Sequence, residues 1–286
     1  MKRNVFIYFA TIFFFLNCNS VFYQPDHRNY YPPEKFNINY DNLMIPFGDE
    51  TLNAWFIKAT SKHIMGTIVQ FHGNAQNLSS HYQSLVWLTN YGYNLFIFDY
   101  PGYGKSTGKL NRKNVRKASQ RLLDFIDKNY LKEQWGERVV LYGQSLGGII
   151  LMDSVSNSLF NAHYSSIILE GTFSSYRSLA MQKVTQYWQL YPFIIPAFLF
   201  ITDDGAVDQR LDQFQVETLK VVIHGEGDHV VPIEFGTRIY ERLSGKKVFI
   251  RVIDGKHIDT FSRSTSFRYK MQLLELLKNT KPYLKS

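Results

Sequence analysis

The stretch LYGQSLGG, residues 141–148, decides the fold because it sets a serine between glycines directly after an apolar run. The run RVVLY, residues 138–142, is rich in β-branched side chains, and GGIILMDSV follows with the apolar character of a buried helix. A G-x-S-x-G pattern between a strand and a helix is the context of a nucleophile elbow, in which a sharp turn exposes the serine hydroxyl. Ser145 is therefore a candidate nucleophile, and the alternative is an ordinary serine in a glycine-rich loop.

The glycines around Ser145 fit the first interpretation. The backbone of such a serine is strained, and side chains at positions 143 and 147 would crowd the turn. Gly148 would allow the new helix to approach the neighbouring strands. We therefore expect the serine to follow a strand closely and to begin a helix.

Similar short apolar runs, most of them followed closely by glycine, recur along the chain. They are rich in Val, Ile and Phe, as is typical of parallel strands buried on both faces. Amphipathic stretches alternate with them, at residues 115–130, 235–243 and 266–279. The pattern predicts an α/β fold with a mostly parallel central sheet flanked by helices. The runs are GTIVQFHG, NLFIFDYPG, RVVLYG, SSIILEG, LKVVIHG and KVFIRVIDG.

Two segments depart from this alternation. In LMIPFGDETLNAWFIK, residues 43–58, two apolar runs flank Gly-Asp-Glu, which predicts an antiparallel N-terminal hairpin. Residues 173–214 show no clear strand and include YWQLYPFIIPAFLF, dense in aromatic residues and proline. We interpret 173–214 as an inserted, cap-like helical segment. Such a segment packs over the end of the sheet, and it can also line an apolar substrate pocket or touch a membrane.

The N-terminus is typical of a targeting signal rather than of a folded element. Lys2 and Arg3 precede an apolar run over residues 5–16, which is shorter than the ~20 residues that span a bilayer. The run ends at Leu-Asn-Cys, which resembles the lipobox of bacterial lipoproteins, although Asn17 stands where a small residue is usual. Cys18 is the predicted lipid attachment residue, and a plain signal peptide or an uncleaved signal anchor are the alternatives.

This interpretation sets the predicted domain boundaries and location. Residues 1–18 are the signal or membrane anchor, residues 19–39 an extended tether, and residues 40–286 the folded domain. Each of the three signal types places the domain outside the cytoplasm of a bacterial cell. We therefore expect a membrane-associated protein of the cell envelope, held through its N-terminal segment.

Composition limits the remaining classes of function. The 286 residues carry a net charge of +8, but the basic residues are scattered and no nucleic-acid-reading motif accompanies them. We therefore expect no nucleic-acid partner. The chain has one cysteine, which can form neither an internal disulfide nor a cysteine-rich metal site. No H-E-x-x-H or paired-carboxylate pattern indicates a metal, and we expect no metal or cofactor.

A nucleophilic serine needs a base and an acid, because a free hydroxyl is a poor nucleophile. In an open parallel sheet, functional groups gather at the carboxyl ends of the strands. His257 follows the last apolar run, and Asp228 follows the preceding one, so Ser145, Asp228 and His257 form a candidate triad. Glu170, after SSIIL, is the alternative acid. His224 and His229 lie beside Asp228 and are interpreted as structural.

The oxyanion formed by attack on a carbonyl needs two N–H donors. One is the N–H of Leu146, directly after the nucleophile, and the other is expected from the loop after an early strand. That loop is QFHGNAQN, which points to the N–H of Asn74. His72, in the same loop, is expected to shape it through hydrogen bonds.

Together these blocks resemble an α/β-hydrolase of the serine aminopeptidase-like group, which includes membrane-associated hydrolases similar to depalmitoylating enzymes. The resemblance rests on FHGNAQN, FDYPGYGKSTG, GQSLGG, VVIHGEGDHVVP and DGKHIDTF, in this order, and covers the chain after about residue 39. It also extends to CNSVFYQPD, which looks like the start of bacterial lipoproteins of this group. It implies the α/β-hydrolase fold, with Ser145 as nucleophile, Asp228 as acid, His257 as base, and Asn74 and Leu146 as oxyanion donors.

The expected activity is acyl hydrolysis of an ester or thioester in a small-molecule or lipid-like substrate. The apolar middle segment suits an acyl chain, and no charged subsite for a peptide amine stands out. A serine peptidase of the aminopeptidase type is one alternative. A non-catalytic envelope protein that reuses the fold for binding is the other, and an adaptor on the membrane surface is a weaker form of it.

Overall fold

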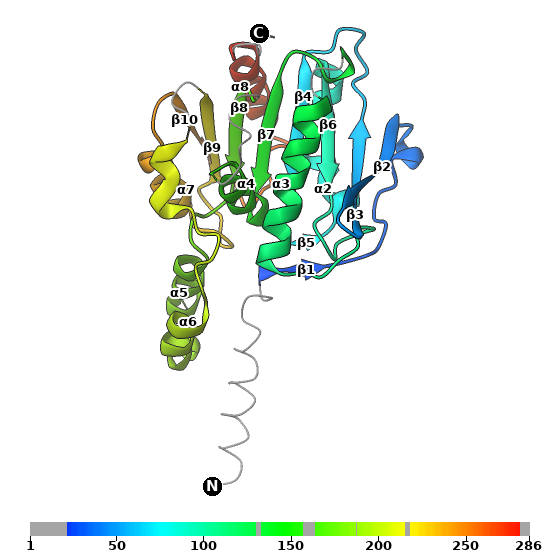
Figure 1. Ribbon diagram of the computed structural model, residues 1–286. Coiled ribbons are helices and arrows are strands. Elements are labelled where there is room, and N and C mark those ends of the chain that lie inside the picture. Colours follow the sequence, from blue (N-terminus) through cyan, green and yellow to red (C-terminus); the bar gives the residue numbers. More distant parts are fainter. Residues whose placement is uncertain (1–21, 130–132, 157–163, 187, 215–217, 281–286) are drawn as a thin grey trace.

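An eight-stranded sheet forms the centre of the protein, as the computed structural model in Figure 1 shows for residues 22–129, 133–156, 164–186, 188–214 and 218–280. The strand order is β10-β9-β8-β7-β4-β6-β3-β2. The strands from β10 to β6 are parallel, whereas β3 is antiparallel to both β2 and β6. Their bounds are β2 (Tyr40–Phe47), β3 (Glu50–Ile57), β4 (Gly66–Phe71), β6 (Tyr93–Phe98), β7 (Val139–Gln144), β8 (Ser166–Glu170), β9 (Leu219–Gly225) and β10 (Lys247–Val252).

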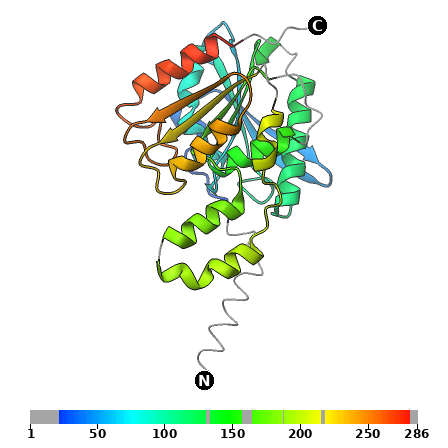
Figure 2. The same cartoon turned by 90° about the vertical axis from the view of Figure 1, so that its left-hand side faces the viewer.

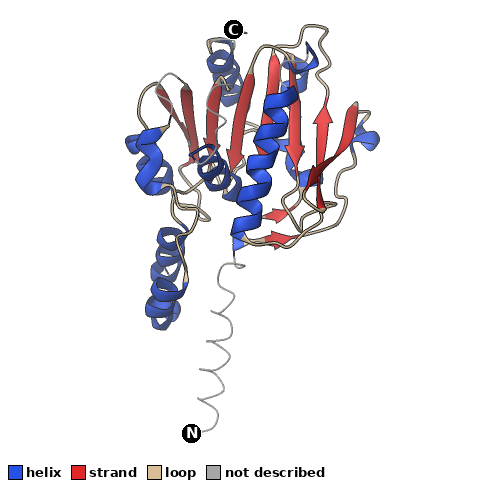
Figure 3. Cartoon of the chain, viewed as in Figure 1, coloured by secondary structure: helices blue, strands red, loops and turns tan. Residues whose placement is uncertain are grey.

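Helices cover both faces of this sheet (Figure 3). One face carries α3 (Arg112–Asn129), α4 (Leu146–Ser156) and α7 (Ile233–Arg242), and the other carries α2 (Leu78–His81) and α8 (Phe267–Lys278). Each face has its own layer of buried apolar side chains. Short 3-10 helices join these elements at η3 (Tyr82–Ser84), η4 (Val86–Tyr91) and η5 (Glu133–Trp135).

The predicted α/β fold is confirmed. All six apolar runs are parallel strands of the sheet. The side chains of β4, β6, β7 and β8 are buried along the whole strand, whereas β10, at the edge of the sheet, is partly exposed. The predicted hairpin is the antiparallel pair β2–β3, in which Phe47 pairs with Glu50. Gly48 in its turn has φ +61°, a left-handed conformation that glycine adopts at little cost.

The described part of the expected tether lies on the domain rather than extending away from it. Strand β1 (Gln24–Pro25) pairs with β5 (Ala75–Gln76), η2 (Pro33–Phe36) follows, and the side chain of Tyr23 is buried. Asn77 Nδ2 donates to the carbonyl oxygens of Asp26 and Arg28, at 2.9 and 2.7 Å. The folded unit therefore begins before residue 40. Cys18 and the rest of residues 1–21 lie outside the described part of the chain.

Residues 173–214 form an excursion built from α5 (Tyr176–Gln186), η6 (Trp188–Phe193), α6 (Ile194–Phe200) and η7 (Asp208–Gln213). Helices α5 and α6 project as a pair beyond the carboxyl end of the sheet (Figures 1 and 2). Asp203 holds the base of this pair, since its carboxylate accepts from Ser175 Oγ and from the Arg177 N–H, each at 3.0 Å. Within the described ranges, no helix has the length and apolar character needed to cross a membrane.

Candidate active site

Ser145 occupies a strained turn between β7 and α4. Its φ is +52°, in the left-handed region that non-glycine residues rarely adopt. The turn is held on both sides, because the Ser145 N–H donates to the Glu170 carbonyl at 2.9 Å and its own carbonyl accepts from Thr172 Oγ1 at 2.6 Å. Strain of this kind persists only where the surrounding structure enforces it, and it gathers at functional sites.

The flanking glycines are required by close packing. A Cβ at Gly143 would lie 2.6 Å from the Gly148 Cα, and one at Gly147 would overlap the carbonyl oxygen of Phe71 in β4. A Cβ at Gly148 would collide with Thr172. A side chain at any of these three glycines would therefore clash with a neighbouring segment, as the prediction of a nucleophile elbow requires.

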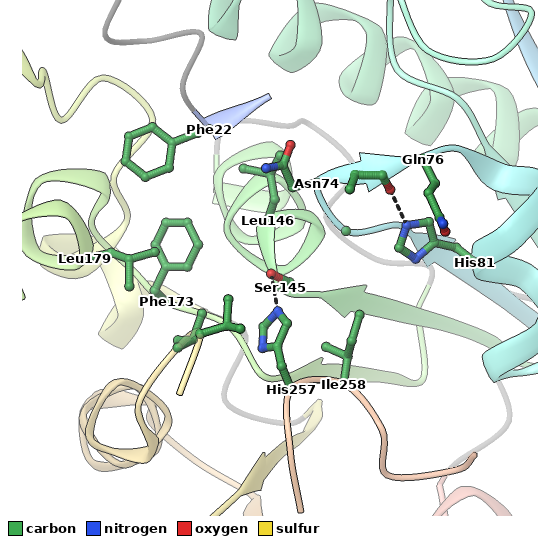
Figure 4. Close-up of a pocket in the computed structure, with 14 residues that line it drawn as sticks. Phe22, Asn74, Gln76, His81, Ser145, Leu146, Phe173, Leu179, His257 and Ile258 are labelled. Atoms are coloured by element: carbon green, nitrogen blue, oxygen red, sulfur yellow. Dashed lines mark hydrogen bonds between the residues drawn. The ribbon is translucent and has the colours of Figure 1, made fainter. Parts of the chain in front are cut away.

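The structure brings Ser145, His257 and Asp228 together, although 112 residues separate the serine from the histidine. His257 Nε2 lies 2.9 Å from Ser145 Oγ, and His257 Nδ1 lies 2.7 Å from Asp228 Oδ2. Figure 4 shows the imidazole directly beneath the serine. One ring nitrogen faces the nucleophile and the other faces a carboxylate, which is the arrangement that a general base requires.

Asp228 is fixed for this role by its own loop after β9. Its Oδ1 accepts from the N–H groups of Val230 and Val231, at 2.8 and 2.9 Å, which leaves Oδ2 directed at His257. The side chain of Glu170, the alternative acid, is engaged elsewhere. Its Oε2 accepts from Tyr142 Oη at 2.8 Å and from Gln144 Nε2 at 2.7 Å, in a buried network below the elbow.

Of the histidines set aside as structural, two are buried. His224 Nε2 lies 2.7 Å from the Val231 carbonyl, and burial lowers the pKa of its imidazole. His72 Nδ1 lies 2.8 Å from the Gly73 carbonyl, and burial holds its pKa well below the usual value. His229 is exposed, and its carbonyl accepts from Lys183 Nζ. His72 shapes its loop, as expected from the sequence.

The loop after β4 places Asn74 in the pocket that Ser145 lines (Figure 4). The Asn74 side chain faces the N-terminal segment, because its Oδ1 accepts from the Gln24 N–H at 2.6 Å and lies 3.3 Å from Tyr103 Oη. The side-chain oxygen of Asn74 is therefore engaged by the N-terminal segment. Leu146 is the first residue of α4, where backbone N–H groups lack partners within the helix. Both predicted oxyanion residues line the same pocket as Ser145.

The pocket above Ser145 has a volume of about 400 Å³ and is mostly apolar. Phe173 and Leu179 line one side, and Ile258 lies beside His257 (Figure 4). Val230 is a further apolar residue of the lining. Phe22, from the segment expected to be a tether, contributes a further wall (Figure 4). A pocket of this size and character, with a few polar groups converging at one end, suits a small ligand with an apolar portion.

Sequence reasoning missed Phe22 and His81. Phe22 reaches the pocket because β1 pairs with β5, a two-residue contact that no local pattern predicts. His81 ends α2 and lines the opposite side of the pocket, with Nε2 2.8 Å from the Ala75 carbonyl (Figure 4). Its placement depends on Asn77, which caps α2 by accepting from the Ser79 N–H. The Asn-x-Ser stretch was the available signal for that helix start.

Comparison with known proteins agrees with the fold. The serine aminopeptidase S33 family, Hydrolase_4, matches residues 62–199. Protein YfhR of Escherichia coli K12 is 28% identical over 259 residues, covering 90% of this chain and 86% of YfhR. The α/β-hydrolase domain-containing protein WAV2 of Arabidopsis thaliana is 26% identical over 259 residues, covering 84% of this chain and 80% of WAV2.

Among solved structures, the esterase Pf2001 of Pyrococcus furiosus superposes with a TM-score of 0.68 at 19% identity, covering 91% of this chain and 98% of Pf2001. The fold and these matches place the chain in the α/β-hydrolase superfamily. Within this superfamily, residues 62–199 are similar to the serine aminopeptidase group.

Proposed function

We propose that the protein is a serine hydrolase that cleaves the acyl bond of a carboxylic ester or thioester. The observation that carries this proposal is the hydrogen-bonded chain from Ser145 Oγ through His257 to Asp228, at one end of an apolar pocket. The class of fold leaves the activity open, since one fold supports many functions.

In the first half of the reaction, His257 Nε2 accepts the hydroxyl proton as Ser145 Oγ attacks the carbonyl carbon. Asp228 holds the Nδ1–H tautomer of the imidazole and stabilises the imidazolium that forms. The N–H groups of Leu146 and Asn74 donate to the oxyanion of the tetrahedral intermediate. His257 then protonates the leaving alcohol or thiol, and the acyl-enzyme remains on Ser145.

In the second half, water attacks the acyl-enzyme. His257 Nε2 takes a proton from the water, and the same two N–H groups stabilise the second oxyanion. Collapse of this intermediate breaks the bond to Ser145 Oγ, which regains its proton from His257. The products are the free acid and the resting enzyme, so the cycle needs no metal or cofactor.

The pocket favours an ester or thioester over a peptide. An aminopeptidase must bind the ammonium group of its substrate, and a buried ammonium needs an opposite charge. None of the described residues that line the pocket carries a carboxylate, and most are apolar. We infer that the acyl portion of the substrate is apolar and of short to medium length, matching a volume of about 400 Å³.

The test is a series of p-nitrophenyl esters and acyl thioesters of increasing chain length, assayed with wild type and Ser145→Ala. We expect turnover by wild type to be highest with short and medium chains and to disappear in Ser145→Ala. Hydrolysis of amino-acid amides but not of esters would favour a peptidase. Equal turnover by the two proteins would refute the catalytic proposal and favour a binding protein.

We further propose that the protein is held in the bacterial cell envelope through its N-terminal segment, with Cys18 lipidated. The support is the sequence alone: a positive start, an apolar run over 5–16, and a cysteine at its end. Cys18→Ala should release the protein from membranes in cell fractionation, or leave an uncleaved precursor. Unchanged processing and retention would show that the segment is a signal anchor.

A further inference from the structure

The 3-10 helix η6 and the helix α6 that follows it expose an unusual set of large apolar side chains. Trp188, Tyr191, Ile195, Phe198 and Leu199 are each more than half exposed, with Trp188 at 73% and Ile195 at 70%. Contiguous exposed apolar surface on a soluble domain marks a site of interaction. We define these five residues as the cap face, and we propose that the cap face docks on an anionic lipid bilayer.

The charge of this segment fits an anionic surface. Residues 176–200 contain Arg177 and Lys183 and no acidic residue. The Arg177 guanidinium lies 5.3 Å from the ring centroid of Phe198, so a cation lies directly beside the apolar side chains. Basic and aromatic side chains together are typical of helices that lie in a bilayer interface. Anionic headgroups attract such cations within the Debye length.

The acidic residues nearest in sequence are already engaged. Asp203 is held at the base of the pair by Ser175 and the Arg177 N–H. Asp204 forms an ion pair with Arg116, at 2.8 Å. The charge of Asp204 is therefore balanced by Arg116, whereas Asp203 is hydrogen-bonded to uncharged donors at the base of the pair. A second copy of the chain is a poorer occupant, because two cap faces would bring like charges together.

The chain enters the domain on the same side. Phe22, the first described residue, packs against Tyr176 of α5, with ring centroids 5.1 Å apart. Residues 1–21 join the domain there, and their sequence is itself basic and then apolar, with Lys2 and Arg3 before the run at 5–16. Figures 1 and 2 both show α5 and α6 at the end of the molecule where the chain enters. The leader and the cap face would thus meet one bilayer together.

This orientation also directs the pocket toward the bilayer, since Phe22 and Leu179 of α5 both line it. The helices lie on the surface rather than cross it, because α6 has seven residues and a span needs about 20. Docking therefore adds a second membrane contact to the leader. It does not depend on catalysis, and Ser145→Ala should dock as wild type does.

Trp188 supplies a probe for the full-length chain. Wild type and Trp188→Phe are reconstituted in phosphatidylglycerol-containing vesicles, with and without brominated acyl chains. The difference between the two emission spectra isolates Trp188 from the other three tryptophans. We expect this difference spectrum to shift to shorter wavelength on the vesicles and to lose most of its intensity with brominated lipid. Anchoring by the leader alone would leave Trp188 in water and unquenched.

Two substitutions, at equally exposed side chains, distinguish a specific role of the cap face from the general effect of adding a surface charge. Ile195→Asp places a charge in the cap face, and Phe267→Asp places one at the first residue of α8, a helix that lies away from α5 and α6 (Figure 1). Both side chains are 70% exposed, so neither substitution opens the core. Bromolipid quenching of Trp188 should be lost in Ile195→Asp and retained in Phe267→Asp. Circular dichroism and thermal unfolding confirm that both variants are folded.

Three results would overturn the proposal. The first is a Trp188 spectrum that is the same with and without vesicles. The second is equal quenching in Ile195→Asp and wild type. The third is shielding of Trp188 in vesicle-free buffer that grows with protein concentration, which would assign the cap face to contact between copies. Each result is independent of ester hydrolysis, so the docking and catalytic proposals can fail separately.

Discussion

The backbone N–H of Gln24 donates to Asn74 Oδ1 at 2.6 Å, and this contact ties the N-terminal segment to the loop that faces Ser145. The pairing of Gln24 with Ala75 in the short β1–β5 sheet strengthens the connection. The segment that leads from the proposed membrane anchor is therefore part of the active-site wall. We expect loss of the Gln24–Asn74 hydrogen bond to change the position of the Asn74 backbone N–H.

Gln24→Pro tests this relationship, because proline removes the N–H donor. We expect kcat to fall about fivefold with a smaller change in KM, since one hydrogen bond contributes about 1 kcal/mol and the oxyanion forms after binding. Gln24→Ala keeps the N–H and alters only an exposed side chain, so it should retain wild-type kinetics. Equal kinetics in both variants would show that the contact does not position the loop.

The assignment of the acid is tested by comparing Asp228→Asn with Glu170→Gln. The first should lower kcat roughly 10³–10⁴-fold, because an amide no longer holds the required tautomer of His257 or stabilises its cation. The second disturbs the bonds to Tyr142 and Gln144, and it should lower thermal stability with a far smaller effect on kcat. The reverse ranking of the two kcat values would reassign the acid to Glu170.

Gly147→Ala tests the steric basis of the elbow. The added Cβ overlaps the Phe71 carbonyl, so α4 must shift away from β4. Overpacking of this kind costs about 1–3 kcal/mol, and the displaced Ser145 should lose most of its activity. Urea denaturation and ester turnover measure the two effects. Ser156→Ala, at the other end of α4, is the control, and a Gly147→Ala protein with control-like activity would argue against a tightly packed elbow.

The stability of the protein should depend on pH through Asp99. Burial raises the pKa of this carboxyl to about 7, from 3.8. Between these values the folded state binds the proton more strongly than the unfolded state, so the free energy of unfolding falls as pH rises. The slope is about 1.4 kcal/mol per pH unit for one group.

Asp99→Asn removes this term and can still accept from the Leu78 N–H, which donates to Asp99 Oδ1. We therefore expect the variant to gain stability relative to wild type between pH 4.5 and pH 7.5, as measured by urea denaturation at each pH. His72 Nε2 lies 3.6 Å from Asp99 Oδ1, so the substitution also changes the surroundings of this imidazole, whose pKa is lowered by burial. A stability difference that does not change with pH would mean that Asp99 is ionised throughout.

The sequence predicted those elements whose formation depends on the residues within the element itself. Buried parallel strands need continuous apolar runs, so β4, β6 and β7 could be recognised without any knowledge of their partners. The G-x-S-x-G pattern likewise encodes its own steric requirement. The order of Ser145, Asp228 and His257 followed from strand ends, which gather at one edge of a parallel sheet.

The remainder depends on contacts between distant segments. The position of Phe22 in the pocket wall follows from a two-residue strand pair and from packing on Tyr176, more than 150 residues away. The sequence of residues 19–39 does not predict this packing, because an extended segment has the same local pattern whether it packs on the domain or is free. The exposed cap face could not be predicted either, since an aromatic-rich sequence is equally consistent with a buried one.

Covalent labelling by a fluorophosphonate tests directly whether Ser145 is the nucleophile. The labelling is measured by mass spectrometry of the intact protein and its peptides. The proposed triad predicts a single adduct on the peptide containing Ser145, with labelling abolished in Ser145→Ala and unchanged in Ser262→Ala, where the serine is exposed and outside the pocket. An adduct on another residue, or equal labelling of Ser145→Ala and wild type, would contradict it.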